Sequence, residues 1–359
     1  MAIVSKQRYS NIELFRIISM LLIVAHHYVV NSGISEEMYK DPVSLKSLYL
    51  YFFGMWGKTG INCFVFITGY FMCQSRITMR KFMKLLLWIY FYRVAIYLVF
   101  SVTGYQSFSF TTFLMLFLPF RNIADGFTGC YLVFFLFIPF LNILIKNLSK
   151  KQHLCLVALC LFIYTLWDNL TPFNVEMNYV IWFCIIYLLA SFIRFYHIGE
   201  HISNKRWGVF TLVSVILSIA SVILNVMMGH HKFSVVFRFV ADCNAIMAVV
   251  VSICSFMYFK GLSMNYHPLI NQIGAATFGV FLIHANSDTM RQWLWKDLLN
   301  NAGHYAGNIY IHSVLSVITI FSICALIDMI RLNLIEKPTF NMLDKQMTKR
   351  NNRLPFHWN

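Results

Sequence analysis

Long apolar segments separated by short polar loops run through the whole 359-residue chain. Most have about 17 to 25 residues, the length at which an α-helix crosses the hydrocarbon core of a bilayer. The pattern predicts an all-α fold, a polytopic membrane helix bundle with about ten transmembrane helices. We place them at residues 12–31, 48–73, 85–104, 128–146, 153–168, 178–196, 207–228, 236–259, 273–293 and 308–331. The aromatic stretch 108–120 is a candidate re-entrant or interfacial segment, so the count can change by one or two.

Composition supports a membrane protein. The chain is 59% hydrophobic and only 12% charged, whereas a soluble domain has about 25% charged residues. We expect the first apolar segment to be kept as a signal anchor, because no small-residue cleavage site precedes the next loop. Residues 1–340 are expected to form one integral membrane domain, and residues 341–359 a basic cytoplasmic tail.

Lysine and arginine are distributed unevenly between the two sets of loops. The richer set contains both chain ends and the loops near Arg76, Lys150 and Arg206. Because cytoplasmic loops are enriched in basic residues, both termini are predicted to be cytoplasmic. The same rule explains the net charge of +15, so nucleic acid is not an expected partner. The basic face can still attract anionic membrane lipid or an anionic nucleotide.

The first span contains polar residues that are costly in lipid: Glu13, Arg16, His26 and His27. Eleven residues at about 100° each advance a helix by three turns plus about 20°, so Arg16 and His27 share a face. They are about 16 Å apart along the axis and can serve opposite ends of a long substrate. Alternatively, Arg16 snorkels to the interface and pairs with Glu13. Ionisable groups inside a membrane are usually functional.

The ninth predicted span has its own polar stripe. His284, Asp288 and Arg291 are spaced i, i+4 and i+7, which places them on one side of a continuous helix. Such a stripe should face the bundle interior or an aqueous cavity. It either lines a substrate path, together with His26, or makes a satisfied helix–helix contact. Arg93 in the third span has the same two interpretations.

Four segments, in order along the chain, resemble the acyltransferase 3 family of integral membrane acyltransferases. In NIELFRIISMLLIVAHHY, Arg16 and His27 match the first-helix signature. The segment TGINCFVFITGYFMCQSR at 59–76 is similar to the family's glycine-rich second-helix element followed by a basic loop. FGVFLIHAN at 278–286 matches the late aromatic-Leu-Ile-His element, and IEKP at 335–338 closes the last span.

The resemblance implies an enzyme that transfers an acyl group, most often acetyl, from cytoplasmic acyl-CoA to a hydroxyl. Acceptors in the family are mainly cell-surface polysaccharides or their lipid-linked glycan precursors. It also implies a multi-pass protein of a bacterial plasma membrane, of the stand-alone type, working beside polysaccharide synthesis or export machinery. No metal is expected.

The residue types suit this chemistry. Ester formation from a thioester needs a base near neutrality, and imidazole is the side chain with that property, so His27 is the predicted catalytic residue. Direct attack by the acceptor and a covalent acyl-histidine both remain open. Arg16 is expected to contact phosphate or pantetheine, or to orient His27. Arg76 and Arg80 are the predicted CoA-binding residues, although cytoplasmic loops are basic in any membrane protein.

Two other function classes also fit intramembrane polar residues. A transporter or flippase for a glycan would be expected to have repeat symmetry or matched broken helices, and the sequence has no obvious pair of these. A non-catalytic partner of an export machine is the second alternative.

Overall fold

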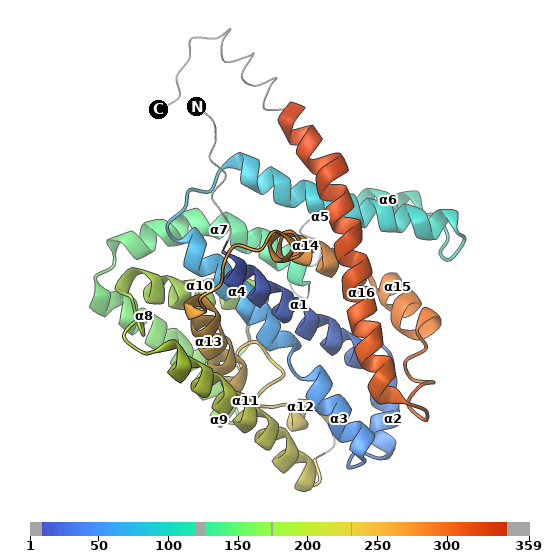
Figure 1. Ribbon diagram of the computed structural model, residues 1–359, viewed down its shortest axis with the longest axis horizontal. Helices are drawn as coiled ribbons and strands as arrows, with labels where there is room; N and C mark the ends of the chain where they lie inside the picture. Colours follow the sequence, from blue (N-terminus) through green and yellow to red (C-terminus); the bar gives the residue numbers. More distant parts are fainter. Residues whose placement is uncertain (1–8, 119–125, 174, 231, 343–359) are drawn as a thin grey trace.

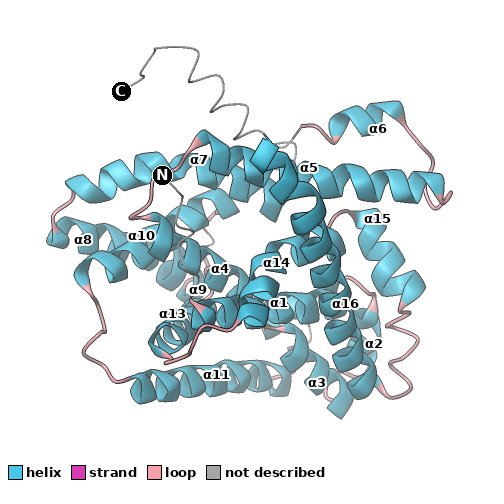
Figure 2. Ribbon diagram, turned by 45° about the horizontal axis from the view of Figure 1, so that its top comes forward, coloured by secondary structure: helices cyan, strands magenta, loops and turns pink. Residues whose placement is uncertain are grey.

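The computed structural model describes residues 9–118, 126–173, 175–230 and 232–342, and these residues form helices and loops without a strand (Figure 2). Seven helical segments are long and apolar enough to cross a membrane, or eight if one bent pair is a single span. This confirms the all-α membrane bundle, whereas the predicted count of about ten is not established. Lys6, Arg8 and residues 343–359 of the predicted tail lie outside the described residues.

Six of the qualifying segments follow the predicted spans closely. They are α1 (Ser10–Val30), α5 (Met79–Val102), α7 (Phe127–Asn147), the segment Lys150–Leu170 formed by α8 (Lys150–Leu161), a π-helical turn (Phe162–Trp167) and α9 (Asp168–Leu170), α10 (Tyr179–Tyr196) and α11 (Asn204–Met227). The seventh, Ile309–Met342, contains α16 (Ile309–Arg331) and a π-helical turn (Leu332–Glu336). The short helices α2 (Ile34–Lys40) and α6 (Phe110–Met115) lie in the connections.

Two predicted spans are interrupted. The span 48–73 consists of α3 (Leu45–Gly54) and α4 (Gly57–Met72), and the span 236–259 is regular only in α13 (Ile246–Gly261), after the four-residue α12 (Phe233–Val236) and a series of turns. At the first break, Gly57 lies against the ring of His26. A Cβ at residue 57 would be 2.3 Å from His26 Cγ. Glycine at residue 57 therefore allows the start of α4 to pack directly against His26 of α1.

The third interrupted span corrects the predicted polar stripe. α14 (Pro268–His284) ends at His284, and a new helix begins with α15 (Asp288–Arg291), continues as a π-helical turn (Gln292–Leu298) and is bent by 94° from α14. The Ser287 side chain accepts a hydrogen bond from the Met290 N–H and caps this new helix. His284, Asp288 and Arg291 therefore do not share one helix face.

α1 and α14 lie in the middle of the bundle, with the long α16 alongside (Figure 1). α1 and α14 run parallel, since Asn271 donates to Ser10 Oγ (3.1 Å) near one end and His27 contacts His284 near the other. α16 runs antiparallel to α1, because Tyr28 of α1 bonds to His312 near the start of α16 (2.8 Å). This arrangement brings the late His284 beside the early His27.

Candidate active site

A cavity of about 330 Å³ lies at the C-terminal end of α1. We call it the His27 cavity. Its polar lining comes from α1 and its C-cap, α4, α5, α7, α10 and the α14–α15 region, specifically His26, His27, Asn31, Lys58, Arg93, Thr128, Tyr179, Asn286 and Arg291. Residues from six separate parts of the chain thus meet at one place.

His27 is connected to a second histidine behind the cavity. The Nδ1 of His27 is 2.9 Å from Nε2 of His284, and His284 is fully buried. The Nδ1 of His284 is 2.6 Å from the Val280 carbonyl oxygen. A carbonyl only accepts, so His284 Nδ1 carries a hydrogen, and in the neutral ring its Nε2 must accept from His27 Nδ1–H.

This chain of hydrogen bonds determines the chemistry available at His27. With Nδ1 protonated and turned to His284, Nε2 is the ring nitrogen left for a ligand in the cavity, and it carries a lone pair. His27 can therefore accept a proton or act as a nucleophile. Among the described residues, no group of three or more His, Cys, Asp or Glu side chains could hold a metal ion.

His26, predicted to lie on a substrate path, also lines the cavity. Its Nδ1 is 2.7 Å from the carbonyl oxygen of Gly54, to which it donates. Gly54 is the last residue of α3, where helical carbonyls have no partner within the helix. One contribution of His26 is therefore to satisfy the break between α3 and α4.

The remaining residues of the predicted stripe are placed differently from one another. Arg291 lines the His27 cavity, and its Nη1 is 2.5 Å from Asp288 Oδ1. The Asp288 side chain is 96% exposed and does not line the His27 cavity. The structure thus brings His284 and Arg291 to the site from two helices and leaves Asp288 at its edge.

Arg16 lies at the other end of α1. Its Nε is 3.8 Å from Glu13 Oε2, an ion pair that the sequence spacing anticipates. Arg16 does not line the His27 cavity, and the partner of His27 Nδ1 is His284. Among the described residues no hydrogen bond joins Arg16 to His27, so orientation of His27 through the shared helix face stays a prediction.

Arg76 and Arg80 lie before and at the start of α5, away from the His27 cavity. Arg76 is exposed, and its carbonyl oxygen accepts from Lys81 Nζ at 2.7 Å. The Arg80 guanidinium lies over the Phe340 ring, 5.8 Å from its centroid. Both residues lie at the bundle end near Arg16. Their contact with CoA stays a prediction.

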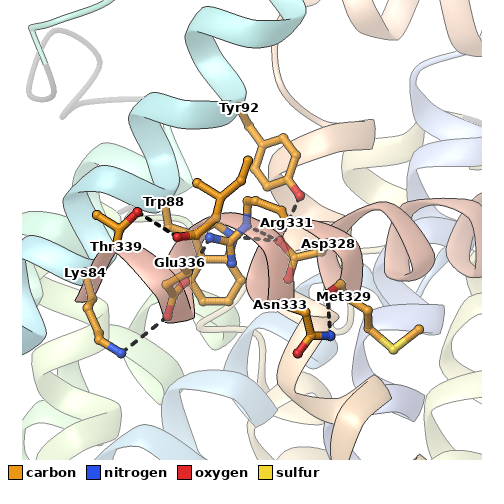
Figure 3. Close-up of polar contacts among 10 residues, drawn as sticks. Lys84, Trp88, Tyr92, Asp328, Met329, Arg331, Asn333, Glu336 and Thr339 are labelled. Carbon is orange, nitrogen blue, oxygen red and sulfur yellow. Dashed lines mark hydrogen bonds and ion pairs between the residues drawn. The ribbon is translucent and has the colours of Figure 1, made fainter. Parts of the chain in front are cut away.

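Sequence reasoning missed a second polar group at that end, shown in Figure 3. Trp88, Tyr92 and Arg331 all donate to Asp328 Oδ1, at 2.9, 2.8 and 2.8 Å. Arg331 Nη1 is 2.8 Å from Glu336 Oε2, which belongs to the IEKP segment, and Lys84 lies 3.5 Å from Glu336 Oε1. We call these six residues the Asp328 cluster. Asp328 within the last apolar span was the signal available in the sequence.

Lys58, within the predicted span 48–73, was not among the predicted site residues. In the structure it donates to the Tyr179 hydroxyl at the start of α10 and lies over the Tyr179 ring. No short-range pattern links residues 58 and 179, so only the fold brings them together.

A family model described as an acyltransferase domain matches residues 9–329, nearly the whole described bundle. No curated protein and no solved structure shows a significant match to the chain. The matched range begins just before α1 and ends within α16, so it includes Arg16, His27 and His284. The chain therefore belongs to the acyltransferase 3 family, and it is a membrane acyltransferase.

Proposed function

We propose that this enzyme moves an acyl group, most simply acetyl, from acyl-CoA to a hydroxyl of a cell-surface polysaccharide or its lipid-linked precursor. The observation that carries the proposal is that His27 lines a cavity of a membrane acyltransferase and that its Nε2 has no hydrogen-bond partner among the described residues. A base with a lone pair facing a solvent-accessible cavity is what O-acylation from a thioester needs.

The reaction follows from the tautomer. His27 Nε2 accepts the proton of the acceptor hydroxyl while the hydroxyl oxygen forms a bond to the thioester carbonyl carbon. The C–S bond of the thioester then breaks, and the CoA sulfur leaves with the proton that His27 holds. The products are the ester and free CoA. A covalent route, in which Nε2 first attacks the thioester, uses the same lone pair.

His284 acts in this proposal as a positioning residue. It keeps the hydrogen of His27 on Nδ1 and fixes the ring plane, because its own Nδ1 is tied to the Val280 carbonyl. When His27 takes up a proton, His284 still accepts from Nδ1–H. Its position behind the cavity keeps it off the substrate.

The donor is proposed to enter at the end of α1 that carries Arg16. The polyanionic nucleotide of acyl-CoA suits the basic segment with Arg76 and Arg80. In this proposal the acyl-pantetheine arm follows the α1 face from Arg16 to His27, over about 16 Å. In this proposal the membrane is a bacterial plasma membrane, and the distribution of basic residues supports this end as its cytoplasmic face.

The test is NMR of the surface polysaccharide from cells with the intact gene, a deletion, or His27→Ala at matched protein level. The O-acyl signal should disappear in the deletion and in His27→Ala while the polymer persists. General-base catalysis contributes about 10²- to 10⁴-fold, so the expected loss is close to complete. His201→Ala is the matched control, because His201 is exposed in the turn after α10.

Two results would contradict the proposal. An unchanged O-acyl signal in the deletion strain would exclude transfer to this polysaccharide. Loss of surface polymer without loss of acylation would favour a transporter or an export partner. If only His27→Ala kept full acylation, the transferase would stand and His27 would not be its base.

A further inference from the structure

The described side chains that line the His27 cavity have an unbalanced charge. Three cationic side chains line it: Lys58, Arg93 and Arg291. Among the described residues, no aspartate or glutamate lines it. Because cations inside a membrane bundle are costly without a partner, this arrangement calls for a compensating group.

The internal partners of these cations compensate only part of the charge. Lys58 bonds to the Tyr179 hydroxyl, a neutral acceptor, and Asp242 is near enough to attract its charge without lining the cavity. Arg291 pairs with the exposed Asp288, and its Nε is buried without a hydrogen-bond partner in the part of the chain that is described. Within that same part, Arg93 has neither a hydrogen bond nor an ion pair. Guanidinium groups at Arg93 and Arg291 thus keep donors available.

The two arginines also link the His27 cavity to a neighbouring one. A second cavity, of about 490 Å³, is lined on one side by Arg93, Asn286, Arg291 and the Asp288 that pairs with Arg291, and on the other side by the α6 region. Arg93, Asn286 and Arg291 also line the His27 cavity. A chain that reached His27 through both cavities would pass both guanidinium groups.

We propose that the acceptor is an acidic glycan, with a carboxylate or phosphate held by Arg93 and Arg291 while a nearby hydroxyl meets His27. This inference rests on the proposed function and adds the substrate class. Arginine suits the role because its planar fork donates two parallel hydrogen bonds to either anion. The donor's phosphates are a poorer match, since the basic segment near Arg76 lies at the opposite end of α1.

The test uses the full chain in proteoliposomes, labelled acetyl-CoA, and the unacylated polysaccharide from the deletion strain. One portion of this polymer stays untreated, one is carboxyl-reduced, and one has its phosphate esters removed. We expect one of the two treatments to lower kcat/KM on the order of tenfold to a hundredfold, as for loss of a charge-assisted hydrogen bond. The sensitive treatment identifies the anion as carboxylate or phosphate.

Arg93→Gln provides the link between the anion and the residue. This variant should have a kcat/KM for untreated polymer that is lower by the same factor. Its kcat/KM should be the same for treated and untreated polymer. Arg206→Gln is the matched control, because Arg206 is exposed in the first turn of α11. The Arg206 variant should keep the full preference for the untreated polymer.

Each contrary outcome has a distinct meaning. Equal use of all three polymers by the unaltered enzyme overturns the acidic-acceptor inference and leaves the proposed function standing. A defect of Arg93→Gln in the KM for acetyl-CoA alone also overturns it, because the cations would then bind the donor. No transfer to untreated polymer defeats the proposed function itself.

Discussion

The two ends of the central helices differ in how far the described residues compensate the charged side chains. In the Asp328 cluster, the carboxylates of Asp328 and Glu336 meet the cations of Arg331 and Lys84, so the formal charges cancel. In the His27 cavity, three cations face a space that no described carboxylate lines. Both groups use α5, because Lys84, Trp88 and Tyr92 belong to the Asp328 cluster and Arg93 lines the His27 cavity.

This difference distinguishes charged side chains that stabilise the fold from charged side chains that are available to a ligand. A buried ion pair that is compensated within the protein needs no ligand, and removing one member leaves an unpaired charge. An uncompensated cation beside a cavity is costly until an anion arrives. The comparison therefore predicts loss of stability at the Asp328 cluster and loss of turnover at the His27 cavity.

The largest effect on stability is expected for Asp328→Ala. Arg331 is 5% exposed and would keep a buried charge without its main partner, so the free energy of unfolding should fall by about 3 kcal/mol. Thermal denaturation of both variants in mild detergent measures this loss of stability. Asp41→Ala, at an exposed position before α3, is the control. Equal stability of the two variants would contradict a structural role for the cluster.

The next effect is on turnover, at His284. His284→Ala removes the acceptor for His27 Nδ1–H, and kcat should fall about tenfold, the value of one hydrogen bond of about 1.4 kcal/mol, with KM nearly unchanged. His284→Gln keeps an oxygen acceptor and should lose less. Steady-state kinetics with acetyl-CoA and polymer separates the two parameters. A change confined to KM, or equal defects in both variants, would exclude the positioning role.

The smallest effect is expected at an exposed ion pair between α10 and α13. Lys260 donates to Glu200 at 2.9 Å and lowers the pKa of its carboxyl below the ordinary 4.5, with a further contribution from His197. The resulting stabilisation is present above pH 4.5 and is lost as the pH falls through the lowered pKa. Glu200→Gln should therefore change stability at pH 7 by less than about 1 kcal/mol. Thermal denaturation at pH 7 and pH 4 tests this, and a loss as large as that of Asp328→Ala would contradict the contrast between buried and exposed pairs.

The sequence predicted the spatial relations that depend on one helix. Arg16 and His27 lie on the continuous α1, and the pair of Arg16 with Glu13 follows from i, i+3 spacing. The sequence-based prediction was wrong at the position where a helix ends. The pattern from 273 to 293 is apolar enough to continue, but the cap at Ser287 redirects the chain.

By itself, the sequence determined the all-helical membrane class, the position of most spans and the polar residues that lipid does not tolerate, because hydrophobicity and helix period are local properties. Only the tertiary structure decided that His284 adjoins His27, that Lys58, Arg93 and Arg291 share one cavity, and that Asp328 is compensated. Those contacts join residues far apart in the chain, and they depend on how close two helices approach and where each one ends. Local patterns do not encode either quantity.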